Sequence, residues 1–290
     1  MTEQSNNEND SFDIEDKNQK RINDYWTPER LNKAIPHPLP EVTEEEKENL
    51  KKKMHSPLVT IECVEPYMPG TDLSDGTPTK ADVGKRPFWN GGKLYYTKPD
   101  GKDYVASAQF CGKDNILLTA AHCIRDHKTG KWSTNVRFYR AYNDGGGQSV
   151  NVTRLTTKKA WVTGGEYDFR FDYSFLVTAA KSEKGWLGWK TGIPYSSWTA
   201  IGYPFNYDDG KYMQKVAGNK GKISGGEVEM LGNPMESGCS GGAWIGDLTA
   251  SGGVGNYVIG LNSNHSTHQN EWSPFFDTGF SSLYRYVTGE

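Results

Sequence analysis

The chain lacks the two sequence features that would mark a membrane-spanning or a nucleic-acid-binding protein. No apolar run approaches the ~18 residues that a membrane helix needs, and mean hydropathy over the 290 residues is -0.74. A membrane-spanning protein is therefore excluded. Lys and Arg (33) are outnumbered by Asp and Glu (36), which gives a formal net charge of -3. This charge does not provide the basic surface that nucleic acid requires.

Glycine is absent from residues 1–60, and aromatic residues are scarce there. This stretch has only Phe12, Tyr25 and Trp26, and it carries 13 acidic against 9 basic residues. The rest of the chain holds all 33 glycines, and this change in composition indicates a boundary. We expect Met1–Lys20 to be disordered, because it has almost nothing to bury. It also lacks the basic head and apolar run of a signal peptide, so either the chain is cytoplasmic or a signal was removed before this numbering begins.

Two short helices are expected within this polar stretch. Thr27 is a suitable N-cap for a helix with Pro28 at its first position, and three prolines between residues 36 and 40 end that helix. Glu44 to Lys53 predicts a charged, solvated helix. On residues alone, the region is equally compatible with a linker or tail and with a pro-segment that packs on the main domain.

From Pro57 onward the sequence is typical of β-structure. Short runs rich in β-branched and aromatic residues alternate with Gly, Asn, Asp and Pro clusters, which predicts antiparallel barrels or a sandwich. Strands are predicted at 94–97, 104–110, 116–120, 136–142, 150–155, 173–177, 198–203 and 257–261. Residues 281–287 predict a closing helix.

A histidine and a carboxylate stand at the ends of two apolar strands. In Leu118–Cys123, two alanines precede His122, and they allow another chain to approach it closely. Taken alone, such a histidine is more often structural than catalytic. In Phe169–Val177, Asp172 opens the strand and must be solvated, paired or hydrogen-bonded, because burial of a bare carboxylate is costly. The alternative is an ordinary Asp in a turn, and Asp168 is a nearby competitor.

A serine flanked by glycines forms the third candidate. Within Glu236–Trp244, Ser240 lies in a backbone that can adopt unusual dihedral angles, and consecutive N–H groups there can bind an anion. An ordinary Gly/Ser loop is the alternative. Together with His122 and Asp172, however, Ser240 supplies what serine nucleophilic catalysis needs: a hydroxyl, a base and an acid that orients the base.

The order of these three residues, with the runs Thr-Ala-Ala-His-Cys and Gly-Cys-Ser-Gly-Gly-Ala-Trp, resembles a chymotrypsin/trypsin-like serine endopeptidase. The resemblance covers roughly residues 88–290. It is closest to the extracellular microbial branch related to glutamyl endopeptidases, and the runs at 201–204 and 272–276 support it. The run Tyr-Trp-Thr-Pro-Glu-Arg at 25–30 resembles part of the pro-regions of such enzymes, which favours the pro-segment interpretation.

The resemblance implies an all-β fold of two antiparallel six-stranded β-barrels with the active site between them. Residues 86–180 would form the first barrel and 181–290 the second, with a short C-terminal helix and an extended pro-like segment at 1–85. Ser240 would be the nucleophile, His122 the base and Asp172 its orienting acid, while the N–H groups of Gly238 and Ser240 would form the oxyanion hole. We expect a secreted, monomeric endopeptidase that acts on protein or peptide substrates without a cofactor or metal.

Two departures from the family pattern concern activation and specificity. Cys239 precedes the nucleophile where the animal digestive enzymes have an Asp that pairs with a new N-terminus, so that activation switch is not expected. Pro234, rather than an Asp, would lie at the bottom of the primary pocket, so a strong preference for Arg or Lys there is not expected. The full set of expected pocket residues is Pro234, Met235, Asn262, Ser263, Asn264 and His265.

The resemblance also favours a disulfide between Cys111 and Cys123, and elimination then leaves Cys63 and Cys239 as a possible second pair.

Two other functional classes stay open. A protease-like fold without useful activity would act as a binding module. A zinc hydrolase would use His122, His127, His265 and His268, but their spacing does not suit a helix face and no acidic ligand is obvious.

Overall fold

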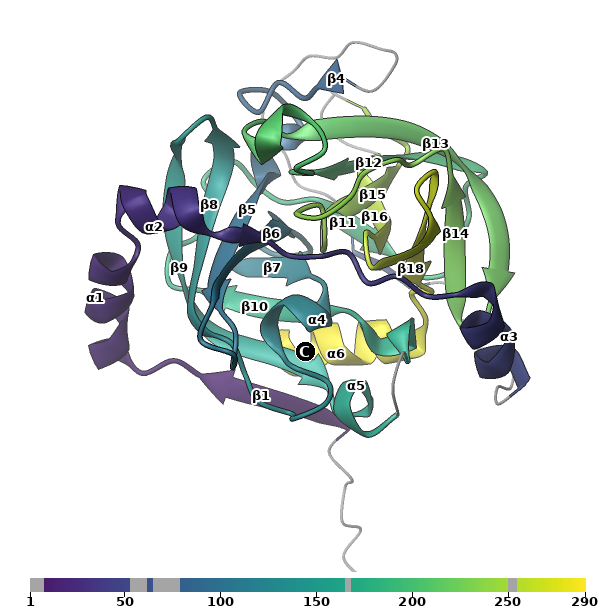
Figure 1. Ribbon diagram of the computed structural model, residues 1–290, viewed down its shortest axis with the longest axis horizontal. Helices are drawn as coiled ribbons and strands as arrows, with labels where there is room; N and C mark the ends of the chain where they lie inside the picture. Colours follow the sequence, from purple (N-terminus) through teal and green to yellow (C-terminus); the bar gives the residue numbers. More distant parts are fainter. Residues whose placement is uncertain (1–7, 53–61, 65–78, 165–167, 250–254) are drawn as a thin grey trace, which may run out of the picture.

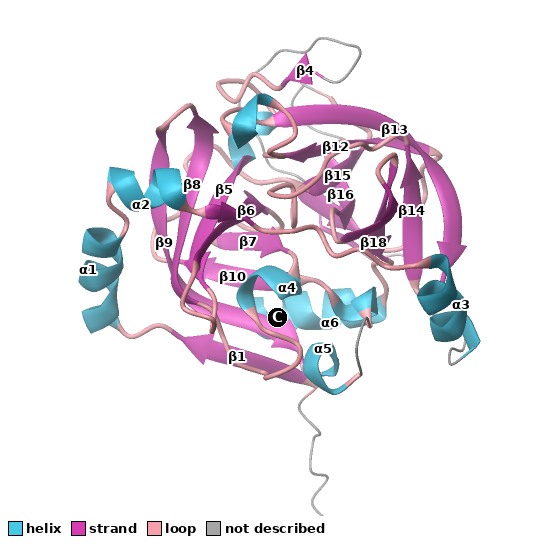
Figure 2. Cartoon of the chain, viewed as in Figure 1, coloured by secondary structure: helices cyan, strands magenta, loops and turns pink. Residues whose placement is uncertain are grey.

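The computed structural model describes residues 8–52, 62–64, 79–164, 168–249 and 255–290. Two mainly antiparallel β-sheets are the largest structural units in these ranges, and they lie side by side in Figures 1 and 2. Helices and 3₁₀ turns are short: α1 (Asp16–Tyr25), α2 (Pro28–Lys33), α3 (Glu44–Lys52), η1 (Phe88–Asn90), α4 (Ala121–Ile124), α5 (Ala160–Thr163), η2 (Phe169–Phe171), η3 (Asp208–Gly210) and α6 (Thr278–Thr288).

The first sheet closes into a six-stranded barrel. Its strands follow the order β9-β10-β7-β6-β5-β8, and β8 pairs again with β9. These strands are β5 (Gly91–Thr97), β6 (Asp103–Phe110), β7 (Ile116–Thr119), β8 (Thr134–Asn143), β9 (Gly146–Lys158) and β10 (Ser174–Thr178). Fully buried apolar side chains, among them Leu94, Phe110 and Phe138, fill the interior. The ring closes between β8 and the first half of β9, at residues 146–151, which leaves one edge of the second half of β9 open to another strand.

The second sheet has the order β17-β18-β14-β13-β12-β15-β16-β11-β3, and β4 pairs with β13. Its strands are β3 (Cys63–Val64), β4 (Thr79–Lys80), β11 (Gly188–Lys190), β12 (Ser197–Gly202), β13 (Gln214–Ser224), β14 (Glu227–Leu231), β15 (Ala243–Gly246), β16 (Tyr257–Leu261), β17 (Asn264–Thr267) and β18 (Asn270–Pro274). Helix α6 packs Phe280 and Tyr284 against Phe175 of the first barrel. The predicted fold class, all-β with two barrels and a short C-terminal helix, is confirmed.

All eight predicted strands coincide with strands of the structure, and the helices predicted to begin at Pro28, to begin at Glu44 and to span 281–287 correspond to α2, α3 and α6. Thr27 caps α2 as expected, because its side chain accepts a hydrogen bond from Arg30 N. The long β13–β14 hairpin was not predicted. Its strands carry many Lys, Gly and Glu residues, and one part of β13 is exposed, so periodicity gave a weak signal there.

The N-terminal residues are folded onto the barrels rather than disordered. The expectation of disorder over Met1–Lys20 is wrong for residues 8–20, while residues 1–7 lie outside the described residues. Strand β1 (Asn9–Asp13) pairs antiparallel with β9, and ion pairs join Asp13 to Arg154 and Glu8 to Lys158. The polar composition of β1 does not predict a strand, because its order depends on pairing with β9 of the barrel.

The stretch between α2 and α3 crosses from the first sheet to the second. In Figure 1 it runs from α2 past β6 and continues over the second sheet to α3. It begins with β2 (Ile35–Pro36), which pairs in parallel with Tyr104 and Val105 of β6. We call residues 34–47 the crossing segment.

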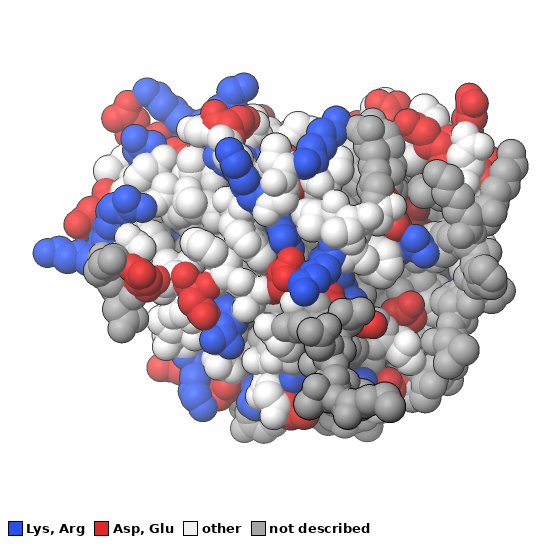
Figure 3. Space-filling view, turned by 90° about the horizontal axis from the view of Figure 1, so that it is seen from below, with Lys and Arg blue, Asp and Glu red and all other residues white. Residues whose placement is uncertain are grey.

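Charges of both signs are mixed on the face of the molecule seen from below in Figure 3, where Lys and Arg side chains are interspersed with Asp and Glu. Among the described residues, no helix is long and apolar enough to cross a membrane.

Candidate active site

His122 and Asp172 meet because β7 and β10 are antiparallel neighbours. Ser174 at the start of β10 pairs with Thr119 at the end of β7. Asp172, just before β10, therefore lies close to His122, just after β7. His122 Nδ1 is 2.7 Å from Asp172 Oδ2, and the backbone N–H of His122 donates to Asp172 Oδ1 at 2.8 Å. The carboxylate is fully buried. It therefore fixes both the ring and the backbone of the histidine.

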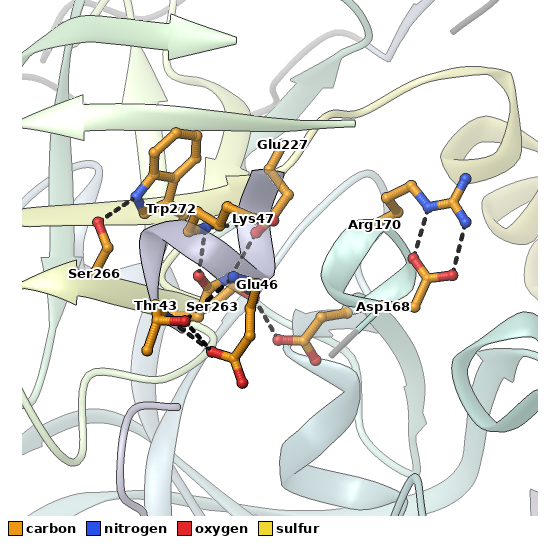
Figure 4. Close-up of polar contacts among 11 residues, drawn as sticks. Thr43, Glu46, Lys47, Asp168, Arg170, Glu227, Ser263, Ser266 and Trp272 are labelled. Carbon is orange, nitrogen blue, oxygen red and sulfur yellow. Dashed lines mark hydrogen bonds and ion pairs between the residues drawn. The ribbon is translucent and has the colours of Figure 1, made fainter. Parts of the chain in front are cut away.

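A second group holds the same carboxylate. Ser263 donates its hydroxyl to Asp172 Oδ2 at 2.6 Å. The competitor Asp168 is instead engaged by Arg170, with two hydrogen bonds of 2.6 and 2.7 Å. Figure 4 shows this pair apart from Ser263. Of the two neighbouring aspartates, the structure brings Asp172 to His122 and Asp168 to Arg170.

The loop that carries Ser240 is fastened to the first barrel. Ser107 of β6 donates its N–H to the Ser240 carbonyl (2.9 Å) and its hydroxyl to the Gly238 carbonyl (3.0 Å). Gly238 and Gly241 both have positive φ (96° and 82°). A Cβ at Gly241 would lie 2.2 Å from Thr119 Oγ1, so only glycine allows the loop to approach the strand that leads to His122.

The structure thus places Ser240 at the same junction as His122, but the two side chains are not hydrogen-bonded. Ser240 Oγ and His122 Nε2 are both buried, and neither makes a hydrogen bond within the described part of the chain. The geometry required for proton transfer between them is therefore incomplete in this structure.

The crossing segment occupies the space in front of these groups. The N–H of Gly238 donates to the carbonyl oxygen of His37 at 2.9 Å. The His37 ring lies against the His122 ring, with centroids 4.9 Å apart and planes inclined by 32°. Lys98 holds His37 in place, since its Nζ is 3.1 Å from His37 Nε2 and also donates to the His122 carbonyl at 3.3 Å.

The crossing segment is held on both sides of His37. Before it, β2 is parallel to β6, and His37 N donates to Val105 O at 2.9 Å. After it, His265 donates its N–H to Pro40 O and accepts from Val42 N, both at 2.9 Å, in a parallel bridge. Val42 is fully buried in a small apolar cluster beside Ala121. The backbone of the segment therefore follows the site for its whole length.

Solved structures with this architecture are proteases. No family model and no curated protein matches the sequence. The protease Anisep from Arthrobacter nicotinovorans is 20% identical over 74% of this chain and 100% of its own, with a TM-score of 0.62. The thermostable serine protease AL20 from an extremophilic microorganism is 24% identical over 70% of this chain and 98% of its own, with a TM-score of 0.60. A Glu endopeptidase is 18% identical over 75% of this chain and 99% of its own, with a TM-score of 0.58.

The fold is that of the chymotrypsin-like serine proteases. The same fold also occurs in an inactivated protease paralogue of the scabies mite, 13% identical over 73% of this chain and 99% of its own, with a TM-score of 0.54. At these identities the likeness concerns the fold, so the chemistry of this chymotrypsin-like chain has to be argued from its own residues.

The expected pocket residues lie on two adjoining stretches, because Asn233 Nδ2 is 3.2 Å from Asn262 Oδ1. Asn262 is fully buried and has no free polar group: it also accepts from Trp244 Nε1 (2.6 Å) and donates to the carbonyls of Ile201 and Cys239 (both 3.2 Å). These bonds tie the loop together. Every polar group of the Asn262 side chain is therefore already engaged within the chain.

The other expected pocket residues face the crossing segment or its surroundings. Met235 is buried in the apolar cluster of the second sheet, and Leu39 of the crossing segment packs into that cluster. Pro234 accepts a hydrogen bond from Asn206 at 2.8 Å. His265 holds the segment backbone, as described above. Ser263 and Asn264 belong to a buried polar network that reaches Asp172.

Burial and neighbouring charges give the two stacked histidines opposite protonation tendencies. Burial lowers the pKa of His122, but the Asp172 carboxylate, together with Cys123, outweighs it and raises that pKa to about 10. The pKa of His37 lies well below its usual value, because of burial first and then the nearby charges of His122 and Lys98. At neutral pH we therefore expect a charged His122 against a neutral His37.

The two expected disulfides are absent from the structure. No bond joins any two of the four cysteines, all of which lie in the described part of the chain. Cys111 lies at the turn of the β6–β7 hairpin, where its N–H donates to Ile116 O, whereas Cys123 follows the opposite end of β7. A disulfide requires Cα atoms within about 7 Å, which opposite ends of a strand do not provide.

The possible second pair, Cys63 with Cys239, fails for a similar reason. Cys63 is exposed on strand β3, at one edge of the second sheet. Cys239 is fully buried next to Ser240 in the chain, and its thiol donates to Glu271 Oε1 at 3.4 Å. The two sulfur atoms therefore face different surroundings.

Sequence reasoning missed several residues that contact the site. His37 had one weak signal, its position between two prolines, which favours an extended backbone. Lys98, in the turn after β5, and Glu227, at the start of β14, gave none. Among the described residues, no three His, Cys, Asp or Glu side chains form a group that could hold a metal ion.

Proposed function

We propose that this protein is a serine endopeptidase of the microbial branch that its sequence resembles, acting through an acyl-enzyme intermediate. Ser240 Oγ attacks the scissile carbonyl while His122 Nε2 takes its proton, and His122 then gives that proton to the leaving nitrogen. Asp172 holds the ring through Nδ1, and the N–H groups of Gly238 and Ser240 stabilise the oxyanion. Water releases the acyl group by the reverse sequence.

One observation carries this proposal most directly. His122 is held at Nδ1 by the buried Asp172, which leaves Nε2 as the ring nitrogen for a proton from the Ser240 loop. A second observation agrees with it: the N–H of Gly238 already binds a carbonyl oxygen, that of His37. The loop therefore offers a hydrogen-bond donor where an oxyanion hole needs one.

We further propose that residues 1–85 are a pro-region and that its crossing segment inhibits the enzyme. The segment blocks the Gly238 N–H, covers His122 and takes both hydrogen-bonding groups of His265. The carbonyl that the Gly238 N–H binds belongs to the His37–Pro38 peptide bond, and the nitrogen of that bond is part of the proline ring. A chain bound in the site can run in either of two directions, and only one of them places the leaving nitrogen of its peptide bond beside His122 Nε2. We assign the opposite direction to the crossing segment, so that its peptide bond is not cleaved. Secretion and the monomeric state stay predictions from the sequence.

A catalytically silent binding module is the second candidate. The missing hydrogen bond between Ser240 and His122 favours it, as does the inactivated paralogue with the same fold. The two candidates differ in the reactivity of the serine, because only an activated hydroxyl reacts rapidly with a fluorophosphonate.

Fluorophosphonate labelling tests the proposal. The chain is cut by a site-specific protease at a recognition sequence inserted between Lys52 and Glu62, so that the crossing segment can leave. Labelling followed by peptide mapping is expected to place the adduct on Ser240, at a higher rate than in the uncut chain. Heat-unfolded protein is the control for unspecific reaction. Lack of labelling in the cut, folded protein would support the binding module.

The protonation of His122 gives a pH prediction. Its pKa of about 10 lies above the ordinary 6.5. The resulting stabilisation is therefore fully present below pH 6.5 and is lost as the pH rises through about 10. In the uncut chain, NMR of the imidazole is expected to show a charged ring at pH 7.5. Asp172→Asn removes the main charge that raises this pKa, so burial should then bring it below 6.5.

The same variant reports on catalysis. In the cut chain, Asp172→Asn is expected to lower kcat by about 10⁴ because the ring loses its tautomer control. Asp168→Asn, four residues earlier in the chain and paired with Arg170, is the matched control. An unchanged His122 titration in Asp172→Asn would contradict the assignment of the orienting acid.

A further inference from the structure

A lysine of the crossing segment lies in a pocket built by the second sheet. Lys47 Nζ is 2.9 Å from Asn264 Oδ1, 3.4 Å from Glu227 Oε2 and 3.8 Å from the centroid of the Trp272 ring. Figure 4 shows the lysine between the indole and the carboxylate. Only 4% of its side chain is exposed. One cation is thus met by a carboxylate, an amide oxygen and an aromatic face, and we call Glu227, Asn264 and Trp272 the cation pocket.

The cation pocket is also held together by contacts among its own residues. Its three residues come from β14, β17 and β18, which are neighbours in one sheet. Asn264 Nδ2 donates to Glu227 Oε1 at 2.6 Å and so fixes the amide with its oxygen toward the cation. Burial raises the pKa of Glu227 even though Lys47 opposes the change. A buried carboxylate of this kind is stable as an anion only with a cation beside it.

The lysine reaches the pocket because helix α3 starts at a fixed place. Thr43 Oγ1 accepts from the N–H of Glu46, and the N–H of Thr43 donates to Glu46 Oε2, which is a reciprocal capping box. Lys47 follows directly on the first turn. The expectation of a solvated helix is therefore wrong at Lys47, which is buried. It holds for the other described side chains of the helix, which are exposed or half-buried.

The cation pocket adjoins the catalytic groups. Asn264 Nδ2 is 3.3 Å from Ser263 Oγ, which donates to Asp172. The next residue, His265, is the one whose backbone binds the crossing segment. A chain bound along His265 therefore passes directly over a site that is built for a positive charge.

We propose that the cation pocket is a substrate subsite that binds the side chain of a Lys or Arg, and that Lys47 fills it only while the crossing segment is in place. This inference rests on the proposed endopeptidase function and names a substrate class for it: chains with a basic residue at one fixed distance from the cleaved bond. Arg suits the pocket as well as Lys, because a guanidinium can stack on the indole while it pairs with the carboxylate.

Binding of a free cation tests the pocket without any need for activity. The full chain carrying Ser240→Ala and Lys47→Ala lacks the side-chain atoms that n-propylammonium can replace. We expect n-propylammonium to raise its melting temperature, whereas 1-propanol, of the same size and neutral, should not. Adding Glu227→Gln should abolish the rise, while Glu229→Gln, also buried on β14, should keep it. Equal effects of the amine and the alcohol would overturn the proposal.

Peptide cleavage tests the subsite itself. Matched peptides with Lys or norleucine at each position around one cleaved bond are given to the cut chain. We expect a single position at which Lys raises kcat/KM about tenfold or more, and Glu227→Gln should bring this ratio close to one while Glu229→Gln preserves it. A ratio near one at every position would overturn the subsite. Failure to cut any peptide would instead contradict the endopeptidase function, and the melting experiment would still decide the pocket.

Discussion

Replacing Ser240 with alanine is expected to lower peptide hydrolysis by the cut chain about a million-fold. The substitution removes the nucleophile but leaves the Gly238 N–H and the His122–Asp172 pair in place, so weak catalysis by the remaining groups is all that persists. The measurement is the initial rate on a fluorogenic peptide mixture, combined with mass spectrometry of the products.

The fold of this variant should be unchanged, because the Ser240 hydroxyl makes no hydrogen bond within the described residues. Circular dichroism and the melting temperature check that expectation. Ser197→Ala, at an exposed position at the start of β12, is the matched control and should retain the activity of the unaltered protein. Undiminished turnover by the Ser240 variant would remove the proposed mechanism.

Cutting the chain between Lys52 and Glu62 is expected to raise peptidase activity by about 100-fold or more. A segment that fills the cleft in 99% of the molecules leaves about 1% able to bind substrate, and the cut removes the advantage of its covalent attachment. The release frees the Gly238 N–H, the His122 ring and both backbone groups of His265. The assay compares initial rates before and after the cut, at high dilution so that the segment can dissociate.

Two controls make this result specific. The cut chain with Ser240→Ala must stay inactive, which excludes a contaminating protease. A synthetic peptide of residues 34–47 should inhibit the cut enzyme and remain intact, as mass spectrometry can show. Equal rates before and after the cut, or cleavage of that peptide at His37–Pro38, would contradict the inhibitory role assigned to the segment.

The strands and the candidate catalytic residues were predictable because the signals are local and chemical. A buried strand such as Tyr257–Leu261 reads as an apolar run, and the stretches around His122 and Ser240 carry distinctive small residues that close packing requires. Asp172 was preferred over Asp168 because it opens the apolar strand, and the family resemblance then agreed with that choice. The physical difference, a partner for Asp168 two residues away in Arg170, appears only in the structure.

The features that escaped prediction depend on pairing between distant parts of the chain. Strand β1 is polar and is ordered by pairing with the edge of β9. Lys47 is charged and is buried because it pairs with Glu227, which lies 180 residues later in the chain. The disulfide between Cys111 and Cys123 was expected from the family resemblance, but strand β7 separates the two cysteines and places them at its opposite ends.

The parallel course of residues 34–42 along both barrels has a practical consequence for ligand design. A ligand that lies backward in a protease cleft keeps the backbone hydrogen bonds while it withholds a scissile bond from attack. Under the proposed function and chain direction, the segment is a template for compounds that resist digestion by their own target, and its valine, leucine and lysine mark the side-chain sites that such compounds would fill.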